Sequence, residues 1–240
     1  MRAQQSYTYQ FGGSLAESKN GPKLTAVCKP VYTDHTFTSG AKKIVHSVCR
    51  FDKACGFIFN DTGNFIGSGA YTIEMYLEQD NISGYNKLID YLNLTEDDGL
   101  YENDGACTFR GPGNVSGDVF IRGAYNFVAI TRDGTTKKVR MYVNGQYIDE
   151  FTDDGERKVA MYDGNKTLRF LQDDNYSDGK EAPSGNIAFL RIFNYAADEQ
   201  AIKGHYGSLF TTLTDKTKEK HSSIRPQQRH NYGLHYITSL

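Results

Sequence analysis

Alternating apolar and polar residues recur along most of the chain, and most alternating stretches end in clusters of Gly, Asn and Asp. Successive side chains of a β-strand point to opposite faces, so a period of two residues is typical of half-buried strands. The pattern predicts strands at residues 6–11, 24–33, 44–51, 55–60, 71–78, 87–92, 125–132, 138–143, 146–151, 168–172 and 186–193. Strands in such close succession predict an all-β fold, a sandwich of two sheets.

The segment VRMYVNGQYIDEF contains the clearest turn. Asn144 and Gly145 separate two alternating stretches, and a type I′ turn needs positive φ at both central residues. Asn and Gly tolerate positive φ best, so the segment predicts a two-residue β-hairpin.

One short helix is expected after the last strand. Asp198 lies near its N-terminus, the apolar side chains of Ala197, Ala201 and Ile202 share one face, and Gly204 can end it. We expect this helix to cover the sandwich as a lid. The chain then becomes polar and basic, so we predict one β-sandwich domain at residues 1–208 and a tail at residues 209–240.

The formal charge is −2, with +3 from residue 209 onward and −5 in residues 1–208. A mildly acidic body with a short basic tail lacks the broad basic face of a nucleic-acid-binding domain, so no nucleic-acid partner is expected. No stretch approaches the roughly 18 apolar residues of a membrane span, and the first residues lack the apolar core of a signal peptide. Membrane insertion is therefore not expected.

Cysteines and sequons bear on the cellular compartment. The four cysteines form no C-x-x-C pair, and they allow either two disulfides in three pairings or four buried thiols. The N-x-S/T sequons could accept glycans in a eukaryotic secretory pathway and are otherwise polar turns. These features favour an extracellular or cell-surface location. The cysteines are Cys28, Cys49, Cys55 and Cys107, and the sequons begin at Asn60, Asn81, Asn93, Asn114, Asn165 and Asn175.

Three segments resemble a laminin-G-like, concanavalin A-like jelly-roll domain. FVAITRDGTTKKVRMYVNGQYIDEF and LRFLQDDNYSDGKEAPSGNIAFLRIFNYAADEQAI are similar to the C-terminal half of such domains, and GAYTIEMYLEQD is similar to a central strand. The similarity spans residues 7–206. It implies a two-sheet antiparallel jelly roll with one concave face.

Members of this family mostly bind glycans, cell-surface proteins or matrix, sometimes through a calcium ion. The resemblance therefore implies a non-catalytic recognition module for a carbohydrate or for a cell-surface or matrix protein. The same architecture also carries glycoside hydrolases, and a purely structural domain of an adhesive or cell-wall assembly is a further alternative.

Glu74, Tyr76 and Glu78 share one face of the strand predicted at residues 71–78. Laminarinase-type glucanases of this family carry E-x-D-x-E on such a strand, and retaining hydrolysis needs two carboxyl groups about 5 Å apart. Here Tyr76 replaces the central Asp, and the chain has no Trp to stack on a sugar. We expect this face to be solvated rather than catalytic, with a hydrolase that uses Glu74 and Glu78 as the alternative.

The segment QDDNYSDGKEAPSG concentrates carboxylates in one loop. Calcium takes six to eight oxygen ligands, so Asp173, Asp174 and Glu181 are the predicted ligands of a Ca²⁺ ion. The alternative is a solvated loop in which Asp and Asn side chains form turns.

Five tyrosines are predicted glycan contacts, because a phenol offers an apolar plane and a hydroxyl group to a sugar. Two lie on the polar faces of predicted strands and three lie in or beside loops; the alternative is that they pack within the sheets. They are Tyr76, Tyr142, Tyr85, Tyr101 and Tyr176.

Overall fold

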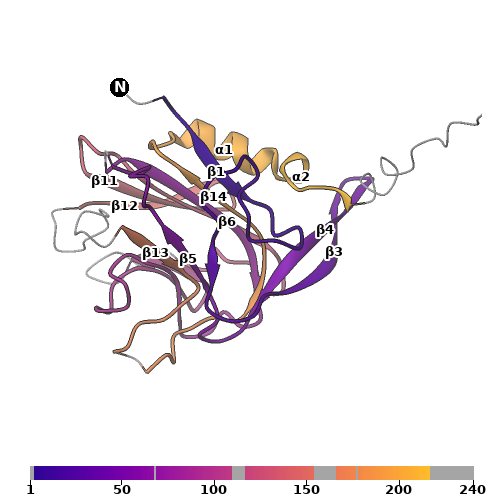
Figure 1. Cartoon of the computed structure of the whole chain (residues 1–240), viewed down its shortest axis with the longest axis horizontal. Helices are drawn as coiled ribbons and strands as arrows, with labels where there is room; N and C mark the ends of the chain where they lie inside the picture. The colour runs from indigo at the N-terminus through magenta and orange to yellow at the C-terminus, as the bar shows by residue number, and fades with distance from the viewer. Residues whose placement is uncertain (1–2, 68, 110–116, 154–165, 177, 217–240) are drawn as a thin grey trace, which may run out of the picture.

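The computed structural model describes residues 3–67, 69–109, 117–153, 166–176 and 178–216. It confirms the all-β prediction, because two antiparallel sheets stack on each other and two short helices lie over the outer face of one of them (Figure 1). No helix within these residues is long and apolar enough to cross a membrane.

The larger sheet has eight strands, and β14 lies inside it between β6 and β4 while also pairing with β1. In spatial order its strands are β12 (Gln146–Thr152), β11 (Lys138–Val143), β10 (Asn126–Arg132), β6 (Tyr71–Gln79), β14 (Gly185–Phe193), β4 (Lys42–Phe51) and β3 (Val31–Ser39), with β1 (Ser6–Tyr9) paired to β14. The smaller sheet has six strands, in the order β2 (Thr25–Ala26), β5 (Phe57–Asn60), β13 (Thr167–Phe170), β7 (Tyr85–Asp90), β8 (Leu100–Asn103) and β9 (Ala106–Phe109).

Most strands lie where the alternation predicts them, with two kinds of exception. The predicted strand at residues 24–33 is two strands in different sheets, separated by a segment that ends at Pro30, which cannot donate a ladder hydrogen bond. Strands β8 and β9 were not among the predicted strands. Nearly all their residues are buried whatever their polarity, so their sequences show no alternation.

The predicted hairpin is confirmed at Asn144 and Gly145, whose φ angles are 50° and 76°. The Asn144 side chain anchors the turn to β10, because its Oδ1 accepts a hydrogen bond of 3.0 Å from the Phe127 amide. A Cβ atom placed on Gly145 would lie 2.8 Å from a ring carbon of Tyr206. The hairpin therefore packs directly against the C-terminal helices.

The predicted helix is confirmed as α1 (Glu199–Gly207), and the Asp198 side chain caps it by accepting a 2.8 Å hydrogen bond from the Ala201 amide. The expected end at Gly204 is wrong, because α1 continues to Gly207 and α2 (Leu209–Thr212) follows it. Leu209 and Leu213 are buried against the larger sheet. The packed chain thus extends beyond residue 208, the predicted boundary, while residues 217–240 lie outside the described residues.

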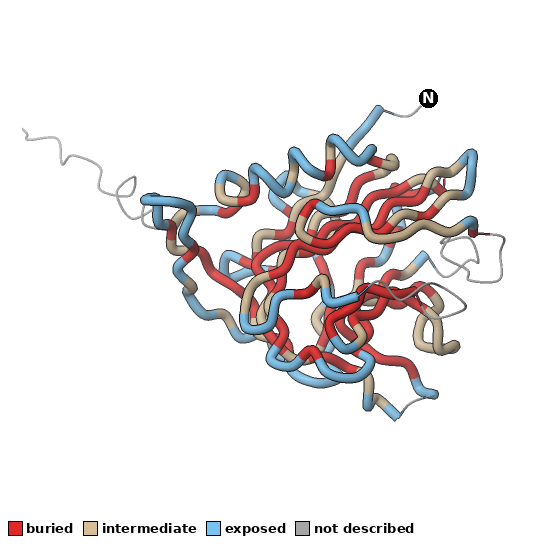
Figure 2. Tube along the Cα trace, turned by 180° about the vertical axis from the view of Figure 1, so that it is seen from behind, coloured by how far each residue is buried: buried red, intermediate tan, exposed pale blue. Residues whose placement is uncertain are grey.

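Two apolar clusters hold these layers together, and the buried residues concentrate in the sheets (Figure 2). The first lies between the sheets, and the second lies between the larger sheet and the helices. Alternation along β6 divides its residues between the two clusters. Tyr71, Ile73, Met75 and Leu77 belong to the first, whereas Tyr76 packs against the second.

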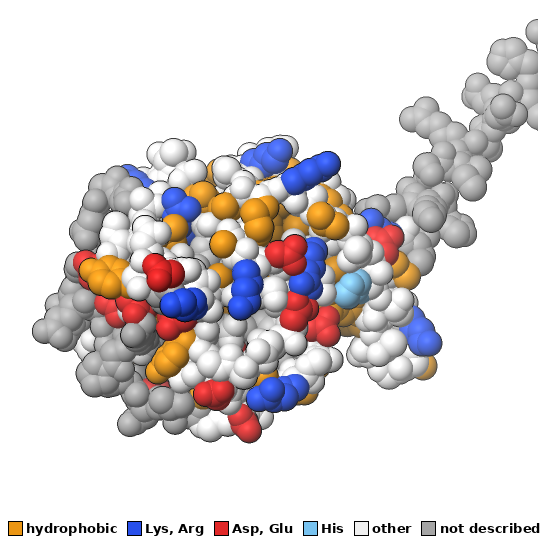
Figure 3. All heavy atoms as spheres, turned by 90° about the horizontal axis from the view of Figure 1, so that it is seen from below, with side chains coloured by type: hydrophobic (Ala, Val, Ile, Leu, Met, Phe, Trp, Pro, Cys, Tyr) orange, Lys and Arg blue, Asp and Glu red, His pale blue; other side chains and the backbone are white. Residues whose placement is uncertain are grey.

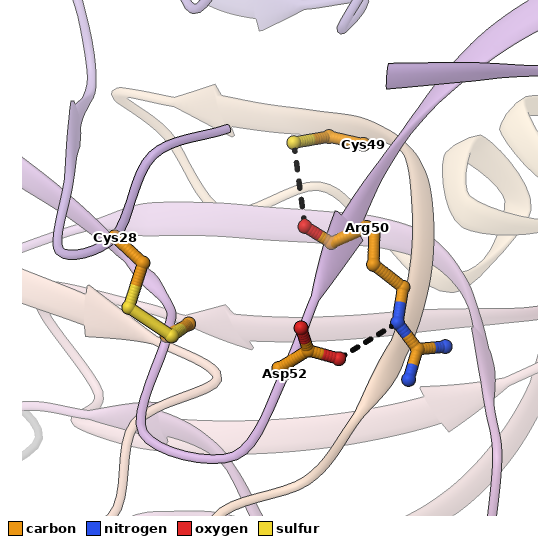
Figure 4. The surroundings of a disulfide bond; sticks show 5 residues. Cys28, Cys49, Arg50 and Asp52 are labelled. Atoms are coloured by element: carbon orange, nitrogen blue, oxygen red, sulfur yellow. Dashed lines mark hydrogen bonds and ion pairs between the residues drawn. A yellow bond between two sulfur atoms is a disulfide. The ribbon is translucent and has the colours of Figure 1, made fainter. Parts of the chain in front are cut away.

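The cysteines combine both alternatives that the sequence leaves open. Cys28 and Cys55 form a disulfide across 27 residues, whereas Cys49 and Cys107 are buried thiols. Figure 4 shows the Cys49 thiol pointing to the carbonyl oxygen of Arg50, to which it donates a hydrogen bond of 3.6 Å. Burial raises the pKa of Cys49 to about 11 and that of Cys107 to about 12, so both thiols stay protonated at neutral pH.

Candidate ligand-binding groove

The outer face of β6 is not solvated at Glu74, contrary to the prediction. Glu74 has no exposed surface because α1 lies over it. Its Oε2 accepts hydrogen bonds of 2.8 Å and 2.5 Å from Arg191 of β14, and its Oε1 is 2.6 Å from His205 Nδ1 of α1. The His205 ring also stacks on Phe193, with ring centroids 5.3 Å apart. Glu74 therefore fixes α1 to the sheet.

This arrangement gives no support to a hydrolase that uses Glu74. A catalytic carboxylate must touch the substrate, either to donate a proton or to attack the sugar. Both oxygens of Glu74 already accept hydrogen bonds, and the side chain is closed off from solvent. Glu78, four residues further along the same strand, is only partly buried.

A groove of about 550 Å³ lies beside this anchor, where α1 and α2 meet the edge of the larger sheet. Such a volume is within the range of about 300–1,000 Å³ that is usual for small-molecule sites. The β3 strand, the middle of β6, the segment before β10 and both helices contribute to it. The lining residues are Thr36, Phe37, Thr38, Ser39, Tyr76, Gly123, Ala124, Tyr125, Tyr206, Gly207, Leu209, Phe210 and Leu213.

Three aromatic rings from distant parts of the chain meet in this groove. The ring centroid of Tyr125 lies 4.8 Å from that of Phe37 and 5.2 Å from that of Tyr76, and Phe37 and Tyr76 are 5.8 Å apart. Phe37 is buried, whereas Tyr76 and Tyr125 are partly exposed. The cluster thus presents two phenol rings to solvent, and both rings pack against the buried ring of Phe37.

The phenol groups of Tyr76 and Tyr125 remain hydrogen-bond donors at physiological pH. Burial raises the pKa of Tyr76 to about 12. Burial also raises the pKa of Tyr125, and the negative charge of Glu78 raises it further. The Tyr125 Oη lies 2.9 Å from His35 Nδ1, which holds the ring in place. A ligand in the groove would therefore meet neutral hydroxyl groups on oriented rings.

The structure places one of the five predicted tyrosines, Tyr76, in the groove. The predicted exposure of Tyr101 and Tyr142 is wrong, because both are buried. Tyr101 lies against the Lys87 ammonium, and Tyr142 lies beneath the helices. Tyr85 and Tyr176 are exposed, at 43% and 71%, but they do not line the groove.

The other aromatic residues of the groove were not predicted as ligand contacts from the sequence. Phe37 belongs to the same alternating strand as His35, but the predicted strand ends at residue 33. Tyr206 and Phe210 lie at the end of α1 and in α2, beyond the predicted end of the helix. Tyr125 directly precedes β10 and, two residues before Phe127, points to the same face of the strand. This alternation was the signal that could have placed Tyr125 beside the groove.

The predicted calcium ligands lie on the other sheet, in the loop between β13 and β14. A solvated loop is the wrong description for two of them, because Asp173 is 7% and Asp174 is 2% exposed. The Asp174 carboxylate forms an ion pair with Lys87 Nζ, and Asp173 Oδ2 accepts a 2.9 Å hydrogen bond from the Glu181 amide. Among the described residues, no three His, Cys, Asp or Glu side chains are arranged to hold a metal ion.

Charged side chains are mixed on the face shown in Figure 3, where Lys and Arg alternate with Asp and Glu among the coloured residues. This face is therefore not a continuous basic surface.

Solved structures of two sugar-bound domains and of the binding domain of a toxin have a similar fold. Domain 4 of AbnA, an extracellular arabinanase from Geobacillus stearothermophilus solved with arabinotriose, has a TM-score of 0.58 at 12% identity, covering 82% of this chain and 96% of its own. The CBM40 domain of the Ruminococcus gnavus IT-sialidase, bound to α2,3-sialyllactose, has a TM-score of 0.52 at 10% identity, covering 67% and 96%. The binding domain of botulinum neurotoxin DC, in complex with rat synaptotagmin II, has a TM-score of 0.54 at 14% identity, covering 86% and 51%.

At these identities the three structures show a shared fold and nothing more. No curated protein sequence matches the chain. A family model does match it, over residues 56–203, a span that runs from the start of β5 into α1. This chain therefore belongs to the concanavalin A-like lectin/glucanases superfamily.

Proposed function

We propose that this chain is a non-catalytic recognition module that binds a neutral carbohydrate in the groove between the larger sheet and the C-terminal helices. The observation that carries the proposal is the cluster of Phe37, Tyr76 and Tyr125 at the groove. A sugar ring presents an apolar face of C–H groups that packs on an aromatic plane, and its hydroxyl groups pair with phenols and alcohols.

The lining of the groove favours a sugar without formal charge. The residues that line it are aromatic, aliphatic, hydroxylic or Gly. An acidic sugar binds best where Arg or Lys forms charge-assisted hydrogen bonds to its carboxylate. The hydroxyl groups of Thr36, Thr38 and Ser39 instead match the hydroxyl groups of a neutral saccharide.

Two further observations support recognition outside the cytosol. Structures of similar fold include domains solved with arabinotriose and with sialyllactose. The disulfide between Cys28 and Cys55 persists in oxidising compartments and is rare in the cytosol. An extracellular or cell-surface lectin-like module is consistent with both.

A glycan array tests the proposal, with the full chain assayed in calcium and again in EDTA. We expect binding to neutral glycans. The Tyr125→Ala variant should weaken it at least tenfold, because a stacked ring contributes more than about 1.4 kcal/mol at the centre of a site. Tyr176→Ala is the matched control, since this ring is 71% exposed and lies outside the groove.

The same experiment separates the alternatives. Binding that Tyr125→Ala leaves unchanged would move the site away from the groove. An array without any binding would contradict the carbohydrate proposal and favour a protein partner, as in the synaptotagmin complex of the neurotoxin domain. Capture of a surface or matrix protein would then be the next test.

A further inference from the structure

The acidic loop between β13 and β14 closes over a buried lysine. Lys87 of β7 has no exposed surface, although its side chain carries an ammonium group. Its Nζ forms an ion pair with Asp174 of the loop and lies 3.5 Å from Oδ2 of Asp90. The ammonium also lies 5.2 Å from the ring centroid of Tyr101 on β8, within the range of a cation–π contact.

The backbone holds the loop in the same place. The Lys87 amide donates a 2.8 Å hydrogen bond to the carbonyl oxygen of Glu181, so the far end of the loop pairs with β7 at the lysine itself. The second oxygen of Asp174 accepts a 2.7 Å hydrogen bond from the Tyr176 amide. Asp174 therefore joins the loop backbone to the ammonium.

Negative charge surrounds this ammonium on several sides. Asp174 and Asp90 face the Nζ atom directly, and Asp173 and Glu181 belong to the same loop as Asp174. Burial raises the pKa of Tyr101, and the charges of these four carboxylates raise it further. Carboxylates gathered in a buried region repel one another unless a cation lies among them. The resemblance to laminin-G-like domains implies that a calcium ion would supply this positive charge.

We propose that the Lys87 ammonium is the resident cation of this acidic loop, and that the loop folds around it without calcium. A calcium ion needs six to eight oxygen atoms at about 2.3–2.6 Å. Both oxygens of Asp174 and Oδ2 of Asp173 already accept hydrogen bonds or ion pairs from the protein. An ammonium needs only the three acceptors that its own protons can reach.

Calorimetry on the unmodified full chain gives the first test. Titration with CaCl₂ should release no heat of specific binding, and the Tm should be the same within about 1 °C in 5 mM calcium and in EDTA. A calcium ion bound only by the folded chain would raise the Tm by several degrees at saturation. Such a rise, abolished by Asp174→Asn, would overturn the proposal.

Substitution of the lysine gives the second test. Lys87→Met keeps the apolar stem and removes the charge, and it should lower the Tm by on the order of 10 °C. Lys180→Met is the matched control in the same loop, because the Lys180 side chain is 80% exposed and should tolerate the change. An equal Tm for the Lys87→Met variant and the parent would also overturn the proposal.

A double variant separates the ion pair from general disruption of the core. Asp174→Asn alone should lower the Tm, because it leaves the ammonium short of a negative charge. Lys87→Met combined with Asp174→Asn should cost less than the sum of the two single changes, since the pair is removed together. Additive losses would contradict a direct pairing. If Lys87→Met does not fold, the calcium titration of the unmodified chain still decides.

Discussion

Replacement of Glu74 by Gln tests whether this carboxylate has a structural or a catalytic role. Gln keeps the volume but removes the charge, and its amide group brings a donor to face the donors of Arg191 or His205. Breaking a buried ion pair costs about 3–5 kcal/mol. The side chains of Arg191 and His205 are 14% and 25% exposed and recover some hydration, so we expect a loss of about 2–3 kcal/mol.

For a domain of this size, such a loss lowers the Tm by about 4–12 °C. Differential scanning calorimetry of Glu74→Gln measures it, and Glu78→Gln on the same face of β6 is the matched control, with an expected change of less than about 1 kcal/mol. A catalytic carboxylate behaves in the opposite way, because its replacement usually leaves stability unchanged or raises it. An unchanged or raised Tm, together with loss of reducing-sugar release from a β-glucan, would refute the structural role.

Three further predictions concern stability. The Cys28→Ser variant removes a disulfide that spans 27 residues, and it should lower the free energy of unfolding in urea by about 3.5 kcal/mol. A urea midpoint unchanged by the variant would contradict this. Thiol labelling of the native chain should leave Cys49 and Cys107 unreacted. Hydrogen bonds from Arg50 hold the pKa of Asp80 below its usual value, although burial acts in the opposite direction. The ion pair therefore stabilises the folded chain fully above about pH 4, and this stabilisation is lost as the pH falls through the folded-state pKa of Asp80. The urea midpoint should therefore fall between pH 4 and pH 2, and less steeply in Asp80→Asn; equal slopes would exclude the pair as the cause. Gly145→Ala places a Cβ atom 2.8 Å from Tyr206 at a φ of 76°, and it should lower the free energy of unfolding by about 1–2 kcal/mol in the same assay. No loss of stability would show that the turn does not pack against α1.

Alternation along a strand identifies which side chains share a face, but it does not show what covers that face. Glu74 and Tyr76 do share the outer face of β6, as the sequence predicts. A helix from more than 120 residues further along the chain then covers Glu74 and leaves Tyr76 at the edge of the groove. Tyr142 was placed on an outer face for the same reason and is 1% exposed. Coverage by distant elements was the missing information.

Pairs of charged residues far apart in the chain were equally beyond sequence reasoning. Lys87 and Asp174 are 87 positions apart, and their partnership depends on the register of β7 beside the acidic loop. Local patterns do better where the geometry is local. The hairpin at Asn144 and Gly145 and the start of a helix beside Asp198 were both predicted correctly, because each depends on a few consecutive residues.

The position of β14 inside the larger sheet has a consequence for the order of folding. β14 is the last strand in the described part of the chain, yet it joins β6 to β4, and it pairs with β1 at Ser6 and Phe193. In the smaller sheet β13 joins β5 to β7 in the same way. The strands of the smaller sheet cannot all pair before the ribosome has passed residue 167, where β13 begins. Those of the larger sheet cannot all pair before it has passed residue 185, where β14 begins. Sheets that depend on such distant pairings form slowly, so the earlier strands must persist with unpaired edges for many seconds of synthesis.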